Sequence, residues 1–159
     1  MSSPSLKALA AVFKKHNVSY VVVGGYALLM QGGDLTTYDI DLCIAYDSEN
    51  LDSLANALNE VGARTRSGEL SRLDRFSFGG AFNTFFTEVG VVQILNRVSG
   101  YESFAELEAQ SVTLTIQTTS VRVAKLAALK AMKLGTGRGK DKIHLSLIER
   151  LEALSTLEE

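Results

Sequence analysis

The sequence feature that most constrains the fold is an apolar run that stops at two glycines. Residues 18–23 read Val-Ser-Tyr-Val-Val-Val, and Gly24 and Gly25 follow directly. Such a β-branched run is typical of a buried strand. Apolar residues recur at helical spacing over residues 6–13 before it, and residues 26–30 can start a short helix after it. We therefore expect a central strand between two helices.

A second predicted strand, over residues 38–45, carries two acidic residues in an apolar setting. Side chains alternate along a strand, so Asp39 and Asp41 should project to one face and Ile40 and Leu42 to the other. Two neighbouring carboxylates repel each other unless a cation lies between them, and Mg²⁺ held by carboxylates and substrate phosphates is one such arrangement. The simpler interpretation is a strand end with two hydrated surface aspartates.

The two glycines favour the cation interpretation. Because they lack a Cβ atom, Gly24 and Gly25 allow backbone N–H groups at the start of a helix to approach an anion such as a triphosphate. A plain tight turn is the alternative. The diglycine and the paired aspartates together are more specific than either motif alone.

The rest of the chain mixes helices and strand pairs without regular alternation. Helices are predicted over residues 48–61, 103–109, 124–134 and 140–154. Strand pairs are predicted over residues 82–89 with 91–95 and over residues 112–116 with 120–123. Residues 63–80 are predicted to form a weak strand, a loop and a further short strand. This mixture predicts the α+β class. A length of 159 residues fits one domain, residues 1–159, with the helices of residues 124–154 packed on the sheet.

Composition excludes several classes of protein. A net charge of −2 argues against a protein that coats duplex nucleic acid over its whole surface. The single cysteine, Cys43, allows neither an internal disulfide nor a Cys-based zinc site, and we expect it to be buried. The sequence shows no signal-peptide pattern and no apolar stretch near the ~20 residues of a membrane span, so we predict a cytoplasmic protein without a membrane partner.

A strand that ends in Gly-Gly, a short helix, and Asp-x-Asp on the next strand resemble the nucleotidyltransferase superfamily, which has the polymerase-β-like fold. The resemblance is closest to small bacterial members of the abortive-infection and toxin–antitoxin type. In these proteins a Leu-x-x-Leu-Lys helix precedes a Gly-Arg-x-Lys-Asp motif, and residues 126–130 and 137–141 match both. The resemblance spans residues 18–45 and 120–151, and it implies a mixed β-sheet with helices packed on it.

The resemblance also implies an activity. Such a transferase moves a nucleoside monophosphate from an NTP to an acceptor hydroxyl on RNA, protein or a small molecule, with Mg²⁺ or Mn²⁺ as cofactor. Asp39 and Asp41 would be the catalytic, metal-binding residues. A tRNA, an antitoxin-like protein and a second copy of the chain are the further partners that it suggests. The nucleotide-binding residues that it implies are Gly24, Gly25, Tyr26, Thr37 and Lys130.

Two positions depart from the family pattern. Gln93 stands where relatives carry a third carboxylate, and Leu35 stands where they carry an arginine. Gln93 is neutral and cannot act as a general base. Glu88 falls on the opposite strand face unless Gly90 forms a bulge. The alternative functions are therefore a catalytically impaired homologue that binds a nucleotide or a protein partner, and a purely structural or dimerisation module.

Basic residues gather near the end of the chain. Residues 122–142 carry seven positive charges and one negative charge. This segment could steer a phosphate-bearing acceptor or an acidic protein, although a solvated helical face explains it equally well. Residues 135–140 look like a P-loop, but the first glycine of that motif is missing before Gly139 and Asp141 stands where the motif requires Ser or Thr. His16 and His144 lack metal-ligand spacing and should lie at the surface or at helix ends.

Overall fold

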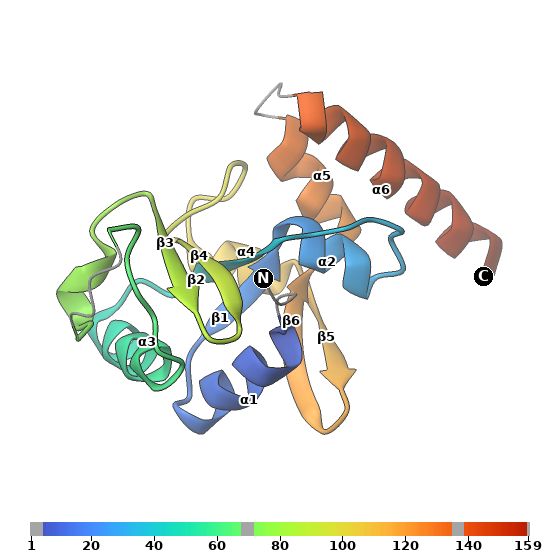
Figure 1. Ribbon diagram of the computed structural model, residues 1–159. Helices are drawn as coiled ribbons and strands as arrows, with labels where there is room; N and C mark the ends of the chain where they lie inside the picture. The colour runs from blue at the N-terminus through green and yellow to red at the C-terminus, as the bar shows by residue number, and fades with distance from the viewer. Residues whose placement is uncertain (1–4, 68–71, 135–138, 159) are drawn as a thin grey trace.

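The computed structural model of the protein describes residues 5–67, 72–134 and 139–158, and it has a six-stranded sheet at its centre (Figure 1). The order across the sheet is β3-β4-β2-β1-β6-β5. Antiparallel pairs join β1 to β2, β3 to β4 and β5 to β6, whereas β1 with β6 and β2 with β4 are parallel. The sheet is thus mixed, as predicted. The strands are β1 (Tyr20–Val23), β2 (Asp39–Ile44), β3 (Phe82–Thr87), β4 (Gly90–Leu95), β5 (Ser111–Ile116) and β6 (Thr119–Ala124).

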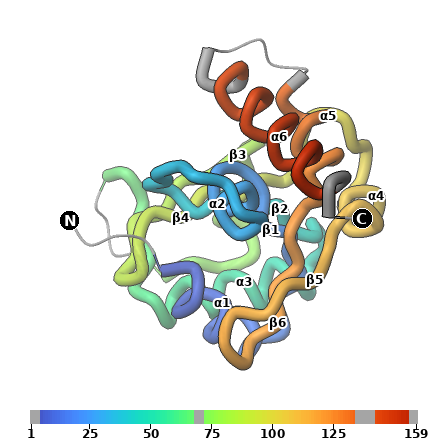
Figure 2. The backbone as a smooth tube through the Cα atoms, turned by 90° about the vertical axis from the view of Figure 1, so that its right-hand side faces the viewer, coloured from blue at the N-terminus to red at the C-terminus, as the bar shows by residue number. Residues whose placement is uncertain are grey.

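The helices gather in two groups. Helices α1 and α3 contact each other, and α5 and α6 form a second contacting pair. Figures 1 and 2, two views at right angles, both place α5 and α6 at the opposite end of the molecule from α1 and α3. The helices are α1 (Leu6–Lys15), α2 (Gly24–Met30), α3 (Ser48–Glu60), α4 (Phe104–Ala109), α5 (Leu126–Leu134) and α6 (Gly139–Glu158), with a short 3₁₀ helix, η1 (Arg75–Phe78).

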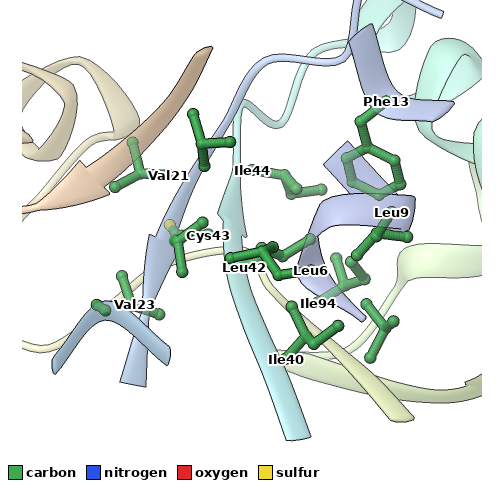
Figure 3. Packing of buried hydrophobic residues seen from close by; sticks show 14 of the residues in the cluster. Leu6, Leu9, Phe13, Val21, Val23, Ile40, Leu42, Cys43, Ile44 and Ile94 are labelled. Atoms are coloured by element: carbon green, nitrogen blue, oxygen red, sulfur yellow. The ribbon is translucent and has the colours of Figure 1, made fainter. Parts of the chain in front are cut away.

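The core lies between α1, α3 and one face of the sheet. Ser5 caps α1 by accepting a hydrogen bond from the Ala8 N–H group, and the buried face of α1 includes Leu9 and Phe13. Figure 3 shows Leu42 and Ile44 of β2 pointing toward this helix. Burying one side chain of this size stabilises the fold by about 1.5–3 kcal/mol. One cluster of buried residues runs from Leu6 to Leu151, which supports our proposal that the chain forms a single domain.

Asn50, at the start of α3, is the only buried polar residue in the described part of the chain. Its side chain accepts a hydrogen bond from the Ser19 N–H group at 2.7 Å, and donates to the carbonyl oxygens of Ser19 and Ala45 at 3.0 and 2.7 Å. These bonds satisfy backbone groups just before β1 and just after β2, which would otherwise be buried at a cost. Asn50 therefore fixes the two strands that carry the aspartates and the diglycine.

The structure departs from the sequence-based expectations in the segment that precedes β3. Arg64 forms one isolated bridge with Phe86. The second short strand predicted within residues 63–80 is absent from the described residues 72–80, where a capping box at Asp74 starts η1 instead. Residues 135–138 of the glycine-rich motif lie outside the described residues. No helix among the described residues is long and apolar enough to cross a membrane.

Candidate functional site

Asp39 and Asp41 lie on the face of β2 opposite the α1 core. Ile40 and Leu42 are fully buried, whereas both aspartates are only partly buried, as the alternation predicted. Asp41 is in register with Val23 on β1 and with Gln93 on β4. One Asp41 oxygen, Oδ1, is shielded from solvent. The acidic pair thus lies at the start of β2, a strand that is paired on both sides within the sheet.

Gln93 lies beside both carboxylates. Its Nε2 atom donates a long hydrogen bond of 3.5 Å to Asp39 Oδ2, and its register partner is Asp41. Glu88 does not lie beside the aspartates. It lies in the β3–β4 turn and points toward Gly62 after α3, where an added Cβ atom would be 3.1 Å from Glu88 Oε1. Thr87 pairs directly with Gly90, so the hairpin has no bulge there that would turn Glu88 toward the aspartates.

The two glycines make room for the acidic residues. Gly24 has a φ of +68°, and a Cβ atom added there would lie 2.3 Å from Asp41 Oδ2. A Cβ at Gly25 would lie 2.9 Å from Thr37 Oγ1, and that hydroxyl donates a hydrogen bond to the Asp39 carbonyl oxygen at 3.2 Å. Any residue with a side chain at position 24 would displace the aspartate. The diglycine, the threonine and the aspartates therefore form one closely packed unit.

A cavity of about 390 Å³ opens beside this unit. Gly24, Asp41 and Gln93 line its sheet side, Phe82 and Leu95 continue that wall, and α5 contributes Met132 and Lys133. Arg97, just after β4, is a second cation in the wall. The volume falls in the range of small-molecule sites, and the wall combines apolar side chains with a few charged groups.

Of the five residues predicted to bind a nucleotide, Gly24 lines the cavity, Gly25 and Thr37 lie beside it in the packed unit, and two lie elsewhere. Tyr26 packs against the core, and burial raises the pKa of its hydroxyl above the usual value. Lys130 does not line the cavity: its Nζ atom lies 3.6 Å from Glu152 Oε1 on α6. Lys133, three residues further along α5, lines the cavity, and sequence reasoning did not select it. Its spacing from Leu129 and Met132, which also line the cavity, is the signal that could have identified it.

The described cations of the basic segment are divided among separate places. Arg122 forms an ion pair with Glu108, Lys130 pairs with Glu152, and Lys133 lines the cavity. Surface pairs of this kind reduce the charge that remains to attract a partner. A nucleic-acid acceptor, an antitoxin-like protein and a second copy of the chain stay predictions.

The oxygen atoms at the site fit a magnesium ion whose remaining ligands come from a phosphate. The described residues contain no group of three or more His, Cys, Asp or Glu side chains placed to hold a metal. Asp39 and Asp41 offer carboxylate oxygens on one strand face, and Gln93 adds an amide group beside them. Mg²⁺ is commonly bound by one or two carboxylates together with substrate phosphates. Such an ion would therefore be held here only in part by the protein.

Neither Cys43 nor His16 contributes to the site. Cys43 is buried, as expected, and burial raises the pKa of its thiol to about 11, so it is a poor nucleophile at neutral pH. His16 ends α1, as predicted for a helix-end histidine, and its Nε2 atom lies 3.0 Å from Glu60 Oε1.

Known structures share this fold. The lincosamide antibiotic adenylyltransferase LnuA, solved with lincomycin bound, is 13% identical, with 94% of this chain and 99% of that chain covered and a TM-score of 0.65. An antigenic nucleotidyltransferase-like protein from Paracoccidioides brasiliensis is 19% identical, with 92% and 73% covered and a TM-score of 0.61. ANT(2″)-Ia in complex with adenylyl-2″-tobramycin is 17% identical, with 94% and 91% covered and a TM-score of 0.54.

Sequence comparison agrees with the fold. A search of curated proteins finds no match. Residues 5–147, however, match the sequence pattern of the family described as aminoglycoside-2″-adenylyltransferase, a match that includes all the elements that form the cavity. The chain therefore belongs to the aminoglycoside-2″-adenylyltransferase family, within the nucleotidyltransferase superfamily.

Proposed function

We propose that the protein transfers AMP from ATP to a hydroxyl group of a small molecule. The observation that carries the proposal is the packed unit of Gly24, Asp39 and Asp41 at the edge of a cavity large enough for a ligand. The family description supports adenylyl transfer, and two proteins of the same fold, LnuA and ANT(2″)-Ia, are described with antibiotic molecules. In this reaction the acceptor oxygen bonds to the α-phosphorus, pyrophosphate leaves, and the acceptor hydroxyl loses its proton.

The residues of the site divide between charge and position, with Asp41 in the cavity wall and Asp39 beside it on β2. Asp39 and Asp41 would hold Mg²⁺, which when bound neutralises charge on the phosphates. Lys133 lines the same cavity and supplies a positive charge for a phosphate oxygen. Gly24 leaves Asp41 the space that it occupies. Such a reaction depends mainly on position and electrostatics, so few protein groups are needed.

Gln93 favours a second candidate function, a nucleotide-binding module with little turnover. Its amide hydrogen-bonds to Asp39 and can orient that carboxylate, but it cannot accept the proton that the acceptor hydroxyl loses. Of the described residues that line the cavity, Asp41 is the only carboxylate. Binding of ATP, unlike transfer of AMP, requires no group that accepts the proton of the acceptor hydroxyl.

Label transfer tests the first function. The protein is incubated with ATP labelled at the α-phosphate, Mg²⁺ and a panel of aminoglycosides, lincosamides and bulk RNA. We expect label on a small molecule, and a loss of at least about 100-fold in Asp39→Asn/Asp41→Asn, as for removal of other groups that stabilise transition-state charge. The matched control is Asp52→Asn, an exposed carboxylate on α3 that pairs with Arg75 at 2.6 Å. Unchanged transfer in the double variant would refute the roles of both aspartates.

Thermal unfolding and one further variant separate the two functions. ATP with Mg²⁺ at 100 times the dissociation constant should stabilise the fold by about 2.7 kcal/mol, which corresponds to a rise in Tm of roughly 5–11 °C. A protein that shows this rise without label transfer is a binding module. In that case Gln93→Asp, which adds a third carboxylate beside Asp39 and Asp41, should produce transfer.

A further inference from the structure

We propose that the Phe82 ring stacks on the nucleobase of the bound nucleotide, so that the apolar end of the cavity determines how tightly the nucleoside is held. This inference rests on the proposed function, because it requires a nucleotide in the cavity. It assigns a role to a residue that no sequence motif indicated.

Phe82 is an apolar side chain left open to solvent at the site. It begins β3, the edge strand of the sheet, and 59% of its surface is exposed although it lines the cavity. The ring contacts in the described part of the chain are Phe13 with Tyr20 and Phe78 with Phe85, and Phe82 belongs to neither pair. An aromatic face is thus available at the cavity mouth, where stacking on a base would remove it from water.

Strand register places Phe82 at a suitable distance from the aspartates. Asp41 is opposite Gln93, Gln93 is opposite Thr84, and Phe82 lies two residues before Thr84 on β3 and opposite Leu95. Because side chains directly opposite each other project to the same face, Phe82 and Asp41 share one face of the sheet. Two interstrand spacings and two residues separate their Cα atoms by roughly 12 Å. A phosphate near Asp41 leaves room for a ribose before a base reaches Phe82.

The chemistry of the cavity wall favours a base over a charged acceptor at this end. Leu95 is the register partner of Phe82, and Met132 of α5 lines the same cavity. These apolar groups suit the face of a neutral heteroaromatic ring, and sulfur makes favourable contacts with such rings. A polycationic acceptor would instead meet Arg97 and Lys133 with only Asp41 to offset them among the described lining residues. The base is therefore the better occupant of the apolar end.

Binding measurements on matched variants test the role of Phe82. Calorimetry gives the affinities for ATP with Mg²⁺ and for inorganic tripolyphosphate with Mg²⁺, a probe that has no base. We expect Phe82→Ala to weaken ATP about 5- to 100-fold, the range that loss of one base–aromatic stack covers, and to leave tripolyphosphate unchanged. Phe82→Tyr should retain the affinity for ATP. The control is Phe86→Ala, which removes a ring that is 41% exposed on the same face of β3 but does not line the cavity.

A fluorescent variant provides a direct readout. The chain contains no Trp, so Phe82→Trp introduces a single indole whose emission should be quenched by ATP and not by tripolyphosphate. The same substitution at Phe86 should respond to neither. Equal ATP affinity in the wild type and in Phe82→Ala would overturn the stacking role, and an effect on the KM for the acceptor alone would assign Phe82 to the acceptor instead. If the wild type binds neither probe, the proposed function fails together with the stacking role.

Discussion

A methyl group at position 24 should damage the site more than it damages the fold. In Gly24→Ala the new Cβ atom would lie 2.3 Å from Asp41 Oδ2, and the backbone φ of +68° is one that residues with a side chain rarely adopt. The left-handed conformation alone costs about 1–2 kcal/mol for alanine. Removing the clash then requires the Asp41 carboxylate to move away from the diglycine, so we expect loss of ATP and metal binding.

Gly62→Ala provides the matched control for backbone strain. Its φ of +67° is nearly the same, but its added Cβ would meet Glu88 Oε1 at 3.1 Å, and that exposed side chain can move aside. Both variants should therefore lower Tm by roughly 2–8 °C, the shift that 1–2 kcal/mol produces in a chain of this size. Calorimetry with ATP and Mg²⁺ should detect binding in Gly62→Ala only. Equal ATP affinity in the two variants would refute the argument that Gly24 exists to accommodate Asp41.

Two further predictions follow from the positions of ionisable groups. Lys133→Met should weaken ATP binding about 10-fold, because a charge-assisted contact to phosphate is lost. Lys130→Met should leave the ATP affinity unchanged, because it removes only the surface pair with Glu152. Equal effects of the two variants in ATP titrations would contradict the assignment of Lys133 to the cavity. Burial raises the pKa of Cys43 from 9.0 to about 11, so its contribution to stability is complete below about pH 9 and is lost as the pH rises toward 11. Urea unfolding at a series of pH values should show this decrease, and Cys43→Ala should make it smaller.

The strands and most helices could be predicted because their patterns are local. Period-two alternation is enough to place Asp39 and Asp41 on one face, and helical spacing gives the buried side of α1. The 3₁₀ helix η1 was missed because a single capping box at Asp74 starts it, and no hydrophobic periodicity indicates it.

The site was only partly predictable because it depends on register and on helix rotation. That Gly24 lies against Asp41 follows from the pairing of Val23 with Asp41, which two separate strand patterns do not determine. Lys130 and Lys133 are both basic residues of one helix, and only the packing of α5 decides which of them lines the cavity. The sequence predicts the hairpin of β3 and β4, but not the register of β4 against β2 that brings Phe82 to the site.

The two ends of the cavity differ in how far apart their residues lie along the chain. Gly24 and Asp41 come from α2 and β2, a continuous stretch that can assemble from near neighbours, whereas Phe82 and Leu95 come from a separate hairpin. Substitutions of Phe82 and Leu95 can therefore reshape what the cavity accepts without disturbing Gly24 and Asp41, as long as Gln93 of the same hairpin keeps its place beside the aspartates. Such independence would allow the same fold to bind new ligands through substitutions at one end of the cavity, while the residues that bind phosphate stay unchanged.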